Sequence, residues 1–116
     1  MLNITEHQTE NATILKLEGN IIMGGGSKKL GQEVRRLIEK GKRNVVLNFS
    51  GVKYLDSSGV GELIALSQTI DEVDGNLMLS SLSEKVEDVL TLSSVLPLFE
   101  IYDDDDEALK SSTNAP

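Results

Sequence analysis

Hydrophobic residues alternate with polar ones in the first part of the chain and then recur at helical spacing. The alternation predicts two strands, over residues 2–8 and 12–18, and the polar residues between them predict a turn that joins the strands into an antiparallel hairpin. Between residues 30 and 38 the leucine, valine and isoleucine side chains fall on one helical face. This spacing predicts an amphipathic helix that ends at Gly41, because glycine commonly follows the last turn of a helix.

A continuous apolar run at residues 45–49 is typical of a strand that helices cover on both faces, and it predicts the central strand of a sheet. Apolar residues at helical spacing then predict a second helix, from Val60 to a stop at Gly75. The remaining pattern predicts a strand at residues 77–79, a helix capped by Ser83, a strand over residues 98–102, and a short helix that starts among the aspartates at 103–106.

A hairpin followed by alternating helices and strands predicts a single α/β domain. We expect a mixed sheet of about five strands, mainly parallel with an antiparallel edge strand, packed with about four helices. A length of 116 residues suits one domain and is too short for two. We assign residues 1–110 to this domain and expect a disordered tail over residues 111–116.

Charge and composition narrow the classes of function. Nineteen acidic residues against eleven basic ones give a formal net charge of -8, which repels nucleic-acid phosphates and anionic membrane surfaces. The chain has no cysteine, so disulfides and thiol nucleophiles are excluded. No apolar run approaches the roughly 18 residues of a membrane span, and the first residues do not resemble a signal peptide. We therefore expect a cytoplasmic protein without nucleic-acid binding or direct membrane insertion.

Three consecutive glycines at residues 24–26 suggest a phosphate-binding loop, but the surrounding residues fit neither of the common glycine-rich spacings. We expect a flexible connection in which Ser27 caps the following helix. Lys28 and Lys29 would then lie in the first helical turn, where positive charge opposes the helix dipole. This mismatch points to contact with a partner.

Catalytic and metal-binding interpretations lack the necessary companion residues, so we expect no catalytic residue, metal or cofactor. A triad of His7, Asp56 and Ser57 would lack the glycine-flanked elbow of a hydrolase nucleophile. An aspartyl-phosphate receiver at Asp56 would need further carboxylates at the ends of neighbouring strands to hold Mg²⁺, and none is paired there. The acidic run at residues 103–107 lacks the glycine and glutamate positions of a calcium loop. A helix-capping, solvated role is favoured for that run.

The motif VVLNFSGVKYLDSSGVGELI places two hydroxyls at the start of a helix, where backbone N–H groups and the helix dipole favour a phosphate. Together with the closing tract KVEDVLTLSSVLPLFEIYDDDDEAL, this motif resembles the STAS domain of bacterial anti-sigma factor antagonists, and the likeness extends over residues 4–109. The resemblance implies that Ser57 is phosphorylated by an anti-sigma factor that is also a serine kinase. In that family the unmodified antagonist binds the kinase and frees a sigma factor, phosphorylation abolishes the binding, and a serine phosphatase restores it. The antagonist itself is not an enzyme.

The resemblance also implies a partner-binding surface at the helix start, formed by Asp56, Ser57, Ser58 and Gly59. Phosphorylatable members often carry an acidic residue in the loop before the first helix. Here that loop has the apolar pair Ile22 and Met23, which are either further docking groups or core residues. The alternative function is a STAS scaffold or accessory subunit of a signalling complex or a lipid transporter. The serine pair would then be only structural.

Overall fold

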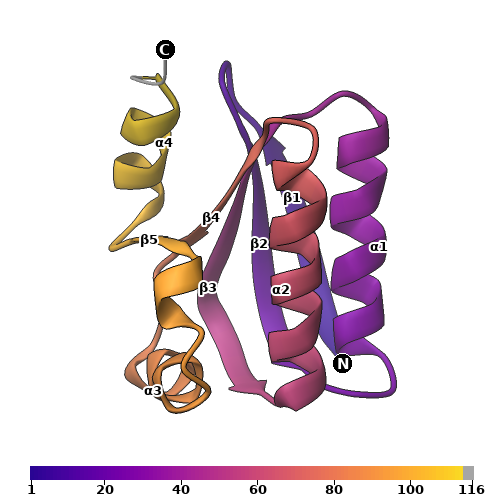
Figure 1. Cartoon of the computed structure of the whole chain (residues 1–116), viewed down its shortest axis with the longest axis vertical. Coiled ribbons are helices and arrows are strands. Elements are labelled where there is room, and N and C mark those ends of the chain that lie inside the picture. The colour runs from indigo at the N-terminus through magenta and orange to yellow at the C-terminus, as the bar shows by residue number, and fades with distance from the viewer. Residues whose placement is uncertain (114–116) are drawn as a thin grey trace.

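A computed structural model describes residues 1–113 of the chain (Figure 1). It confirms a single α/β domain with a mixed sheet of five strands and four α-helices. The helices and strands, in chain order, are β1 (Leu2–Gln8), β2 (Thr13–Ile21), α1 (Gly26–Glu39), β3 (Asn44–Leu55), α2 (Ser57–Asp71), β4 (Asn76–Ser80), α3 (Glu84–Leu92), the short 3-10 helix η1 (Leu96–Leu98), β5 (Glu100–Tyr102) and α4 (Asp105–Thr113).

The sheet follows the chain, with the strand order β1-β2-β3-β4-β5. β1 pairs with β2 antiparallel, and each later neighbour pairs in parallel, so the predicted hairpin and central strand are both confirmed. β3 is longer than its apolar run, and its last residue Leu55 pairs with Ile21 at the end of β2. β4 pairs only with the first part of β3 and ends opposite Asn48. The ends of β2 and β3 therefore form the carboxyl edge of the sheet near Leu55.

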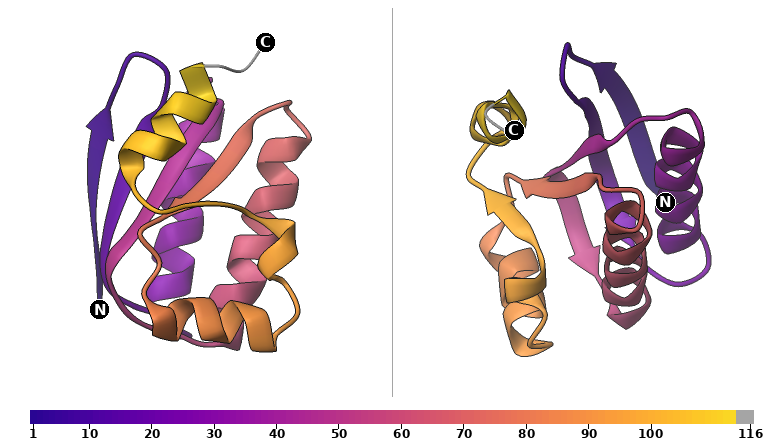
Figure 2. Two further views of the ribbon diagram at one scale, coloured as in Figure 1. Left: turned by 90° about the vertical axis from the view of Figure 1, so that its left-hand side faces the viewer. Right: turned by 45° about the horizontal axis from the view of Figure 1, so that its top comes forward.

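Two hydrophobic clusters lie on opposite faces of the sheet. The larger one joins buried side chains of α1, α2 and α3 to the strands, with Leu15, Leu47 and Phe49 fully buried. The smaller one packs Ala108 of α4 against Ile14 and its neighbours on β3 and β4. Figure 2 shows α1 and α2 together on one side of the sheet and α4 on the other. Within residues 1–113, no helix has both the length and the apolar character needed to cross a bilayer.

A polar cluster fixes α4 to its face of the sheet. The carboxylate of Asp105, in the first turn of α4, accepts two 3.0 Å hydrogen bonds from Asn48 Nδ2 and one of 2.5 Å from Ser80 Oγ. Ser80 is fully buried, and Asn48 is 9% exposed. Asn48 Oδ1 in turn accepts the backbone N–H of Ser50 at 2.9 Å. Buried polar groups need hydrogen-bond partners. Asp105 supplies them for Asn48 on β3 and Ser80 on β4, and these bonds anchor α4 to the sheet.

The helix ends combine expected and unexpected caps. Gly41 has a left-handed backbone after α1, as predicted, and its N–H donates to the Ile38 carbonyl. After α2, the left-handed position is Asp74 rather than Gly75, although the Gly75 N–H does donate to the last turn, at Ile70 O. Ser83 caps α3 as predicted, because its Oγ accepts the N–H of Val86 at 3.2 Å.

Three other expectations differ from the structure. α1 begins at Gly26, so Ser27 lies inside the first turn and donates its hydroxyl to the Ile22 carbonyl instead of capping the helix. The last strand begins at Glu100, since η1 takes up Leu98. α4 continues to Thr113, and the rest of the tail that we expected to be disordered, residues 114–116, lies outside the described residues.

Candidate functional site

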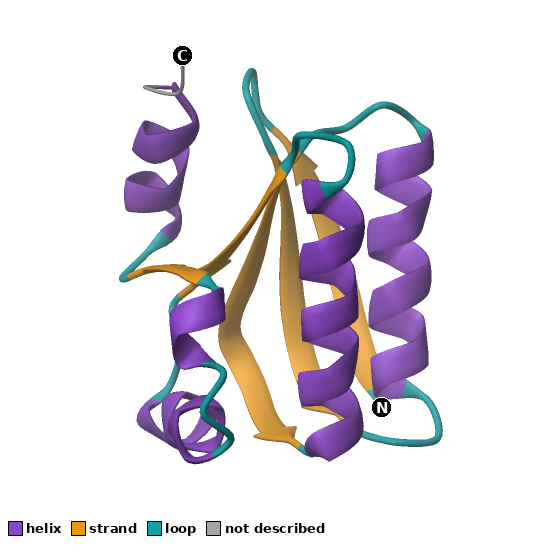
Figure 3. Ribbon diagram, viewed as in Figure 1, coloured by secondary structure: helices purple, strands orange, loops and turns teal. Residues whose placement is uncertain are grey.

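The segment around Ser57 and the loop before α1 meet at the carboxyl edge of the sheet. Figure 3 shows the β2–α1 loop and the short β3–α2 connection at the same end of the domain. The backbones at the starts of α1 and α2 lie very close to the backbone at the end of β2. A side chain on Gly59 would place its Cβ 2.4 Å from the Ile21 carbonyl oxygen, and one on Gly26 would lie 2.1 Å from the carbonyl oxygen of Asn20. Both helices therefore start directly against the end of β2, and only glycine permits that approach.

Asp56 is the N-cap of α2 and also holds the neighbouring loop. Its Oδ1 accepts the N–H of Gly59 at 3.0 Å and the hydroxyl of Ser58 at 2.6 Å. Its Oδ2 accepts the N–H of Met23 at 3.0 Å. The Ser58 hydroxyl, followed by the N–H groups of Met23 and Gly59, lowers the pKa of Asp56 to about 2, because each donor stabilises the ionised carboxylate. Asp56 is thus negatively charged at neutral pH, and its carboxylate holds the start of α2 and the β2–α1 loop together through these hydrogen bonds.

The two serines have different surroundings. Ser58 is half-buried, donates to Asp56, and has its Oγ 3.2 Å from Ser27 Oγ on α1. Ser57 is exposed, and its hydroxyl has no hydrogen bond to any residue of the described chain. Ser58 is therefore an internal contact between the two helix starts. Ser57 presents its hydroxyl to the solvent.

The apolar pair of the β2–α1 loop is divided between interior and surface. Ile22 is half-buried, whereas Met23 is 75% exposed although its backbone is fixed by Asp56. Beside them lies a groove of about 520 Å³, which we call the loop groove. It is lined by Met1, Leu2, Ile22, Met23, Gly24, Gly25, Gly26 and Lys29. The structure thus brings all six predicted site residues to one end of the domain, and the groove adjoins them.

Groups that would support catalysis or metal binding do not gather at this site. His7 pairs with Ile14, which lies seven residues before the end of β2 at Ile21, or about 23 Å at roughly 3.3 Å per strand residue. Ser57 follows Leu55, the partner of Ile21, so His7 and Ser57 cannot form a triad. Within residues 1–113, no three histidine or carboxylate side chains lie together in a way that could hold a metal ion.

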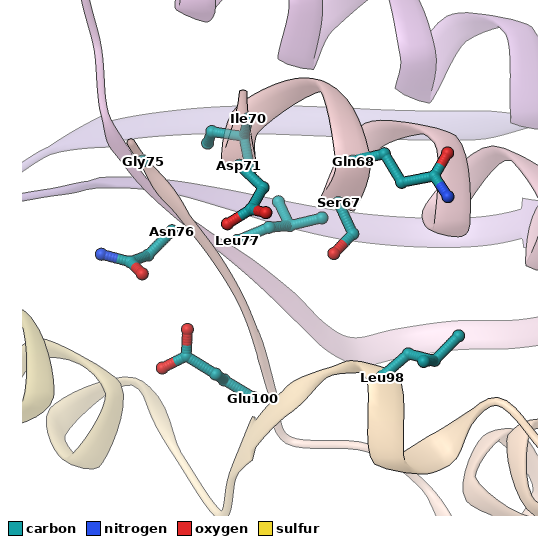
Figure 4. Close-up of a pocket in the computed structure, with 9 residues that line it drawn as sticks. All are labelled: Ser67, Gln68, Ile70, Asp71, Gly75, Asn76, Leu77, Leu98 and Glu100. Atoms are coloured by element: carbon teal, nitrogen blue, oxygen red, sulfur yellow. The ribbon is translucent and has the colours of Figure 1, made fainter. Parts of the chain in front are cut away.

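A second hollow, of about 250 Å³, lies away from the carboxyl edge, between α2, β4 and β5. Figure 4 shows the side chains of Ser67 and Asp71 on α2, with Leu77 beside them, and Glu100 on β5 below them. It contains no lysine, arginine or histidine, so a serine there has no basic partner to activate it. None of the predicted site residues lines this hollow.

Sequence reasoning missed three features of the site. Asp56 is the cap of α2, and the same carboxylate accepts the N–H of Met23 across 33 positions of sequence. The third feature is the contact between Ser27 and Ser58. Aspartate three residues before Gly59 was a usable signal for the cap, because an N-cap side chain accepts from the third residue of the helix. The contact between Ser27 and Ser58 had no such signal, since it depends on how closely α1 and α2 start together.

Residues 3–108 match the STAS domain family. A protein of Bordetella bronchiseptica named as an anti-sigma factor antagonist, BtrV, is 25% identical over 100 residues, which cover 86% of this chain and 85% of that protein. A Thermotoga maritima protein named in the same way has a crystal structure with a TM-score of 0.84 and 27% identity. That alignment covers 96% of this chain and 95% of the Thermotoga chain.

The fold is also that of the anti-sigma factor antagonist SpoIIAA, whose structure is known in two states. The unphosphorylated form has a TM-score of 0.75 and 19% identity, with 97% of this chain and all of the SpoIIAA chain covered. The phosphorylated form, from Bacillus, has a TM-score of 0.70 and 20% identity, with 94% and 98% covered. At this level of identity the likeness concerns the fold.

Proposed function

The chain belongs to the STAS domain family, and on this premise we propose that it is a cytoplasmic anti-sigma factor antagonist whose partner binding is switched by phosphorylation of Ser57. The unmodified domain binds an anti-sigma factor with serine kinase activity, which releases a sigma factor. The kinase phosphorylates Ser57 and so ends the binding, and a serine phosphatase reverses the modification. Relatives named as anti-sigma factor antagonists support this role.

The observation that carries the proposal is the difference between the two adjacent serines. A kinase needs an accessible hydroxyl, and Ser57 is exposed without a hydrogen bond to the described chain. Phosphorylating Ser58 would require breaking its 2.6 Å hydrogen bond to Asp56 and moving it away from Ser27. The structure of SpoIIAA in phosphorylated form gives a precedent within the same fold.

The switch works by charge and does not require refolding. Phosphoserine adds about 1.5 to 2 negative charges at neutral pH. The adjacent N-cap Asp56 is also ionised, but its charge is compensated by three hydrogen-bond donors, and the first turn of α2 that follows has no acidic residue. The helix N-terminus itself favours negative charge. The same phosphate buried in an interface reduces the free energy of binding by about 2 to 5 kcal/mol, which corresponds to roughly 30-fold to several-thousand-fold weaker binding.

The first test is to incubate the protein with ATP and each purified serine kinase of the anti-sigma factor class from the source genome. Mass spectrometry should locate one phosphate, on Ser57. Ser57→Ala should abolish the modification, and the matched variant Ser58→Ala should retain it. Absence of phosphate on either serine with an active kinase would favour the alternative of a STAS scaffold or accessory subunit.

The second test measures binding to that kinase by calorimetry. Ser57→Ala should bind as the wild type does, and Ser57→Asp should bind at least 10-fold more weakly, since even one added charge lies in the interface. Both variants should keep the wild-type circular dichroism spectrum. Equal affinities of the two variants would contradict an electrostatic switch.

A further inference from the structure

We propose that the loop groove binds an extended segment of the kinase in which an apolar side chain is flanked by a carboxylate. This inference rests on the proposed function and names the chemistry of its partner. The apolar side chain lies against Ile22 and Met23, and the carboxylate pairs with the lysines in the first turn of α1. The groove is separate from Ser57 but adjoins it through the Asp56–Met23 hydrogen bond.

The apolar part of the groove is presented on a fixed backbone. Asp56 Oδ2 accepts the Met23 N–H, and the Ser27 N–H donates to the carbonyl of Ile22 at 3.2 Å, so the loop is held at both sides. Met23 nevertheless leaves 75% of its surface exposed. Gly24 and Gly25 have open space where a side chain would be, which leaves a bare backbone beside Met23 for an approaching chain. A volume of about 520 Å³ is within the usual range of binding pockets, roughly 300 to 1,000 Å³.

The first turn of α1 brings positive charge to the loop groove: Lys29 lines it and Lys28 is the neighbouring residue, while the nearby carboxylate of Asp56 is occupied by Met23, Ser58 and Gly59. Residues 19–32 contain two lysines and no carboxylate, whereas the whole protein has a formal net charge of -8. Lys29 Nζ donates to the carbonyl of Leu2 at 2.9 Å, which is a neutral partner, and Lys28 is exposed without an ion pair to any described residue. Both lysines oppose the dipole of α1, so they do not serve the stability of that helix. Charge complementarity therefore selects an acidic partner segment.

The position of the groove also strengthens the proposed switch. A carboxylate held by Lys28 would lie near the start of α2, because Ser27 and Ser58 are in contact there. Phosphate on Ser57 would then add negative charge at the same end of the domain as the acidic group of the partner. The acidic segment would make the partner sensitive to phosphorylation by direct repulsion.

The test compares binding of the purified kinase to matched variants by calorimetry. Lys28→Glu and Met23→Ala should each weaken binding by about 10-fold. Lys40→Glu makes the same charge change at the other end of α1, and Leu92→Ala removes an 85% exposed apolar side chain from α3; both controls should bind as the wild type does. Lys28→Glu should also raise the melting temperature, since a carboxylate suits the start of a helix.

Three outcomes would overturn the inference. Wild-type affinity of Lys28→Glu and Met23→Ala, with weakened binding of Ser57→Asp, would reject the groove and keep the proposed function. Tighter binding of Lys28→Glu would show that the partner segment is basic. If the wild type neither binds any such kinase nor is phosphorylated by one, the proposed function fails, and the groove inference fails with it.

Discussion

Asp56 and Asp105 use the same chemistry in two regions of the molecule and achieve different results. Each carboxylate stands at the start of a helix and accepts a serine hydroxyl, at 2.6 Å for Asp56 and 2.5 Å for Asp105. The other donors to Asp56 are backbone N–H groups, one of them in the β2–α1 loop. The other donor to Asp105 is the side-chain amide of Asn48, 57 positions away in sequence.

The two aspartates therefore have different roles: Asp56 positions a surface site, and Asp105 fixes a helix to the sheet. Asp105 satisfies the buried polar groups of β3 and β4, and its loss would leave Asn48 and Ser80 without a partner for those donors. Asp56 binds groups near the surface, and its hydrogen bonds keep Ser58 occupied while Ser57 stays exposed. We therefore expect changes at Asp105 to affect stability alone and changes near Asp56 to affect both stability and binding.

The largest effect is expected for Asp105→Ala. Removing the carboxylate leaves two buried donors unsatisfied, which should lower the free energy of unfolding by about 2 to 4 kcal/mol. The matched control is Asp106→Ala, an exposed neighbour with no hydrogen bond to the described residues, which should change stability by less than about 1 kcal/mol. Urea unfolding measures both. Similar losses in the two variants would show that helix charge, and not the buried cluster, holds α4 in place.

A smaller effect separates two glycines of α2. Gly59→Ala should cost about 1 to 3 kcal/mol, because its Cβ would lie 2.4 Å from the Ile21 carbonyl oxygen and 2.5 Å from a methyl group of Leu55. Gly61→Ala should instead stabilise the protein by about 0.5 to 1 kcal/mol, since that position is open and alanine favours the helix. Thermal unfolding distinguishes them. Equal melting temperatures would mean that α2 does not start tightly against β2.

The smallest effect is the pH dependence from Asp56. Its pKa falls from 3.8 to about 2 on folding, so the ionised carboxylate contributes stability above about pH 4. That contribution is lost as the pH falls through the folded value near 2. The wild type should therefore lose more melting temperature between pH 4 and pH 2 than Asp56→Asn does. Parallel pH profiles of the two proteins would contradict the assignment of Asp56 as the charged cap.

Much of the fold could be predicted because its determinants are local. The alternation in β1 and the helical spacing of leucines in α1 gave the right elements, and Gly41 and Ser83 gave the right helix boundaries. The central strand was shorter in prediction than in the structure. Beyond Phe49, Ser50 and Gly51 interrupt the apolar run, and Lys53 and Tyr54 follow Val52, so a search for apolar runs does not detect the second half of β3.

The details that escaped prediction depend on contacts between distant segments. Ser27 is a good capping residue, but the cap of α1 is Gly25, two residues earlier, and the helix starts where Gly26 approaches the Asn20 carbonyl. The buried cluster of Asp105 unites residues from three elements, and the acidic run that contains it reads in the sequence as solvated charge. At the candidate site the motif identified the right segment. The structure was needed to show that the Ser58 hydroxyl is hydrogen-bonded to Asp56 and that the Ser57 hydroxyl is accessible.

The attachment of the first strand has a practical consequence for experiments on binding. The backbone carbonyl of Met1 accepts the N–H of Asn20, and Leu2 lines the loop groove, so an affinity tag fused to Met1 would emerge beside the proposed docking surface. α4 ends at the opposite end of the domain (Figure 1). Tags, fluorophores and immobilisation linkers therefore belong after α4, and apparent weak affinity with an amino-terminal fusion would reflect steric blocking by the label.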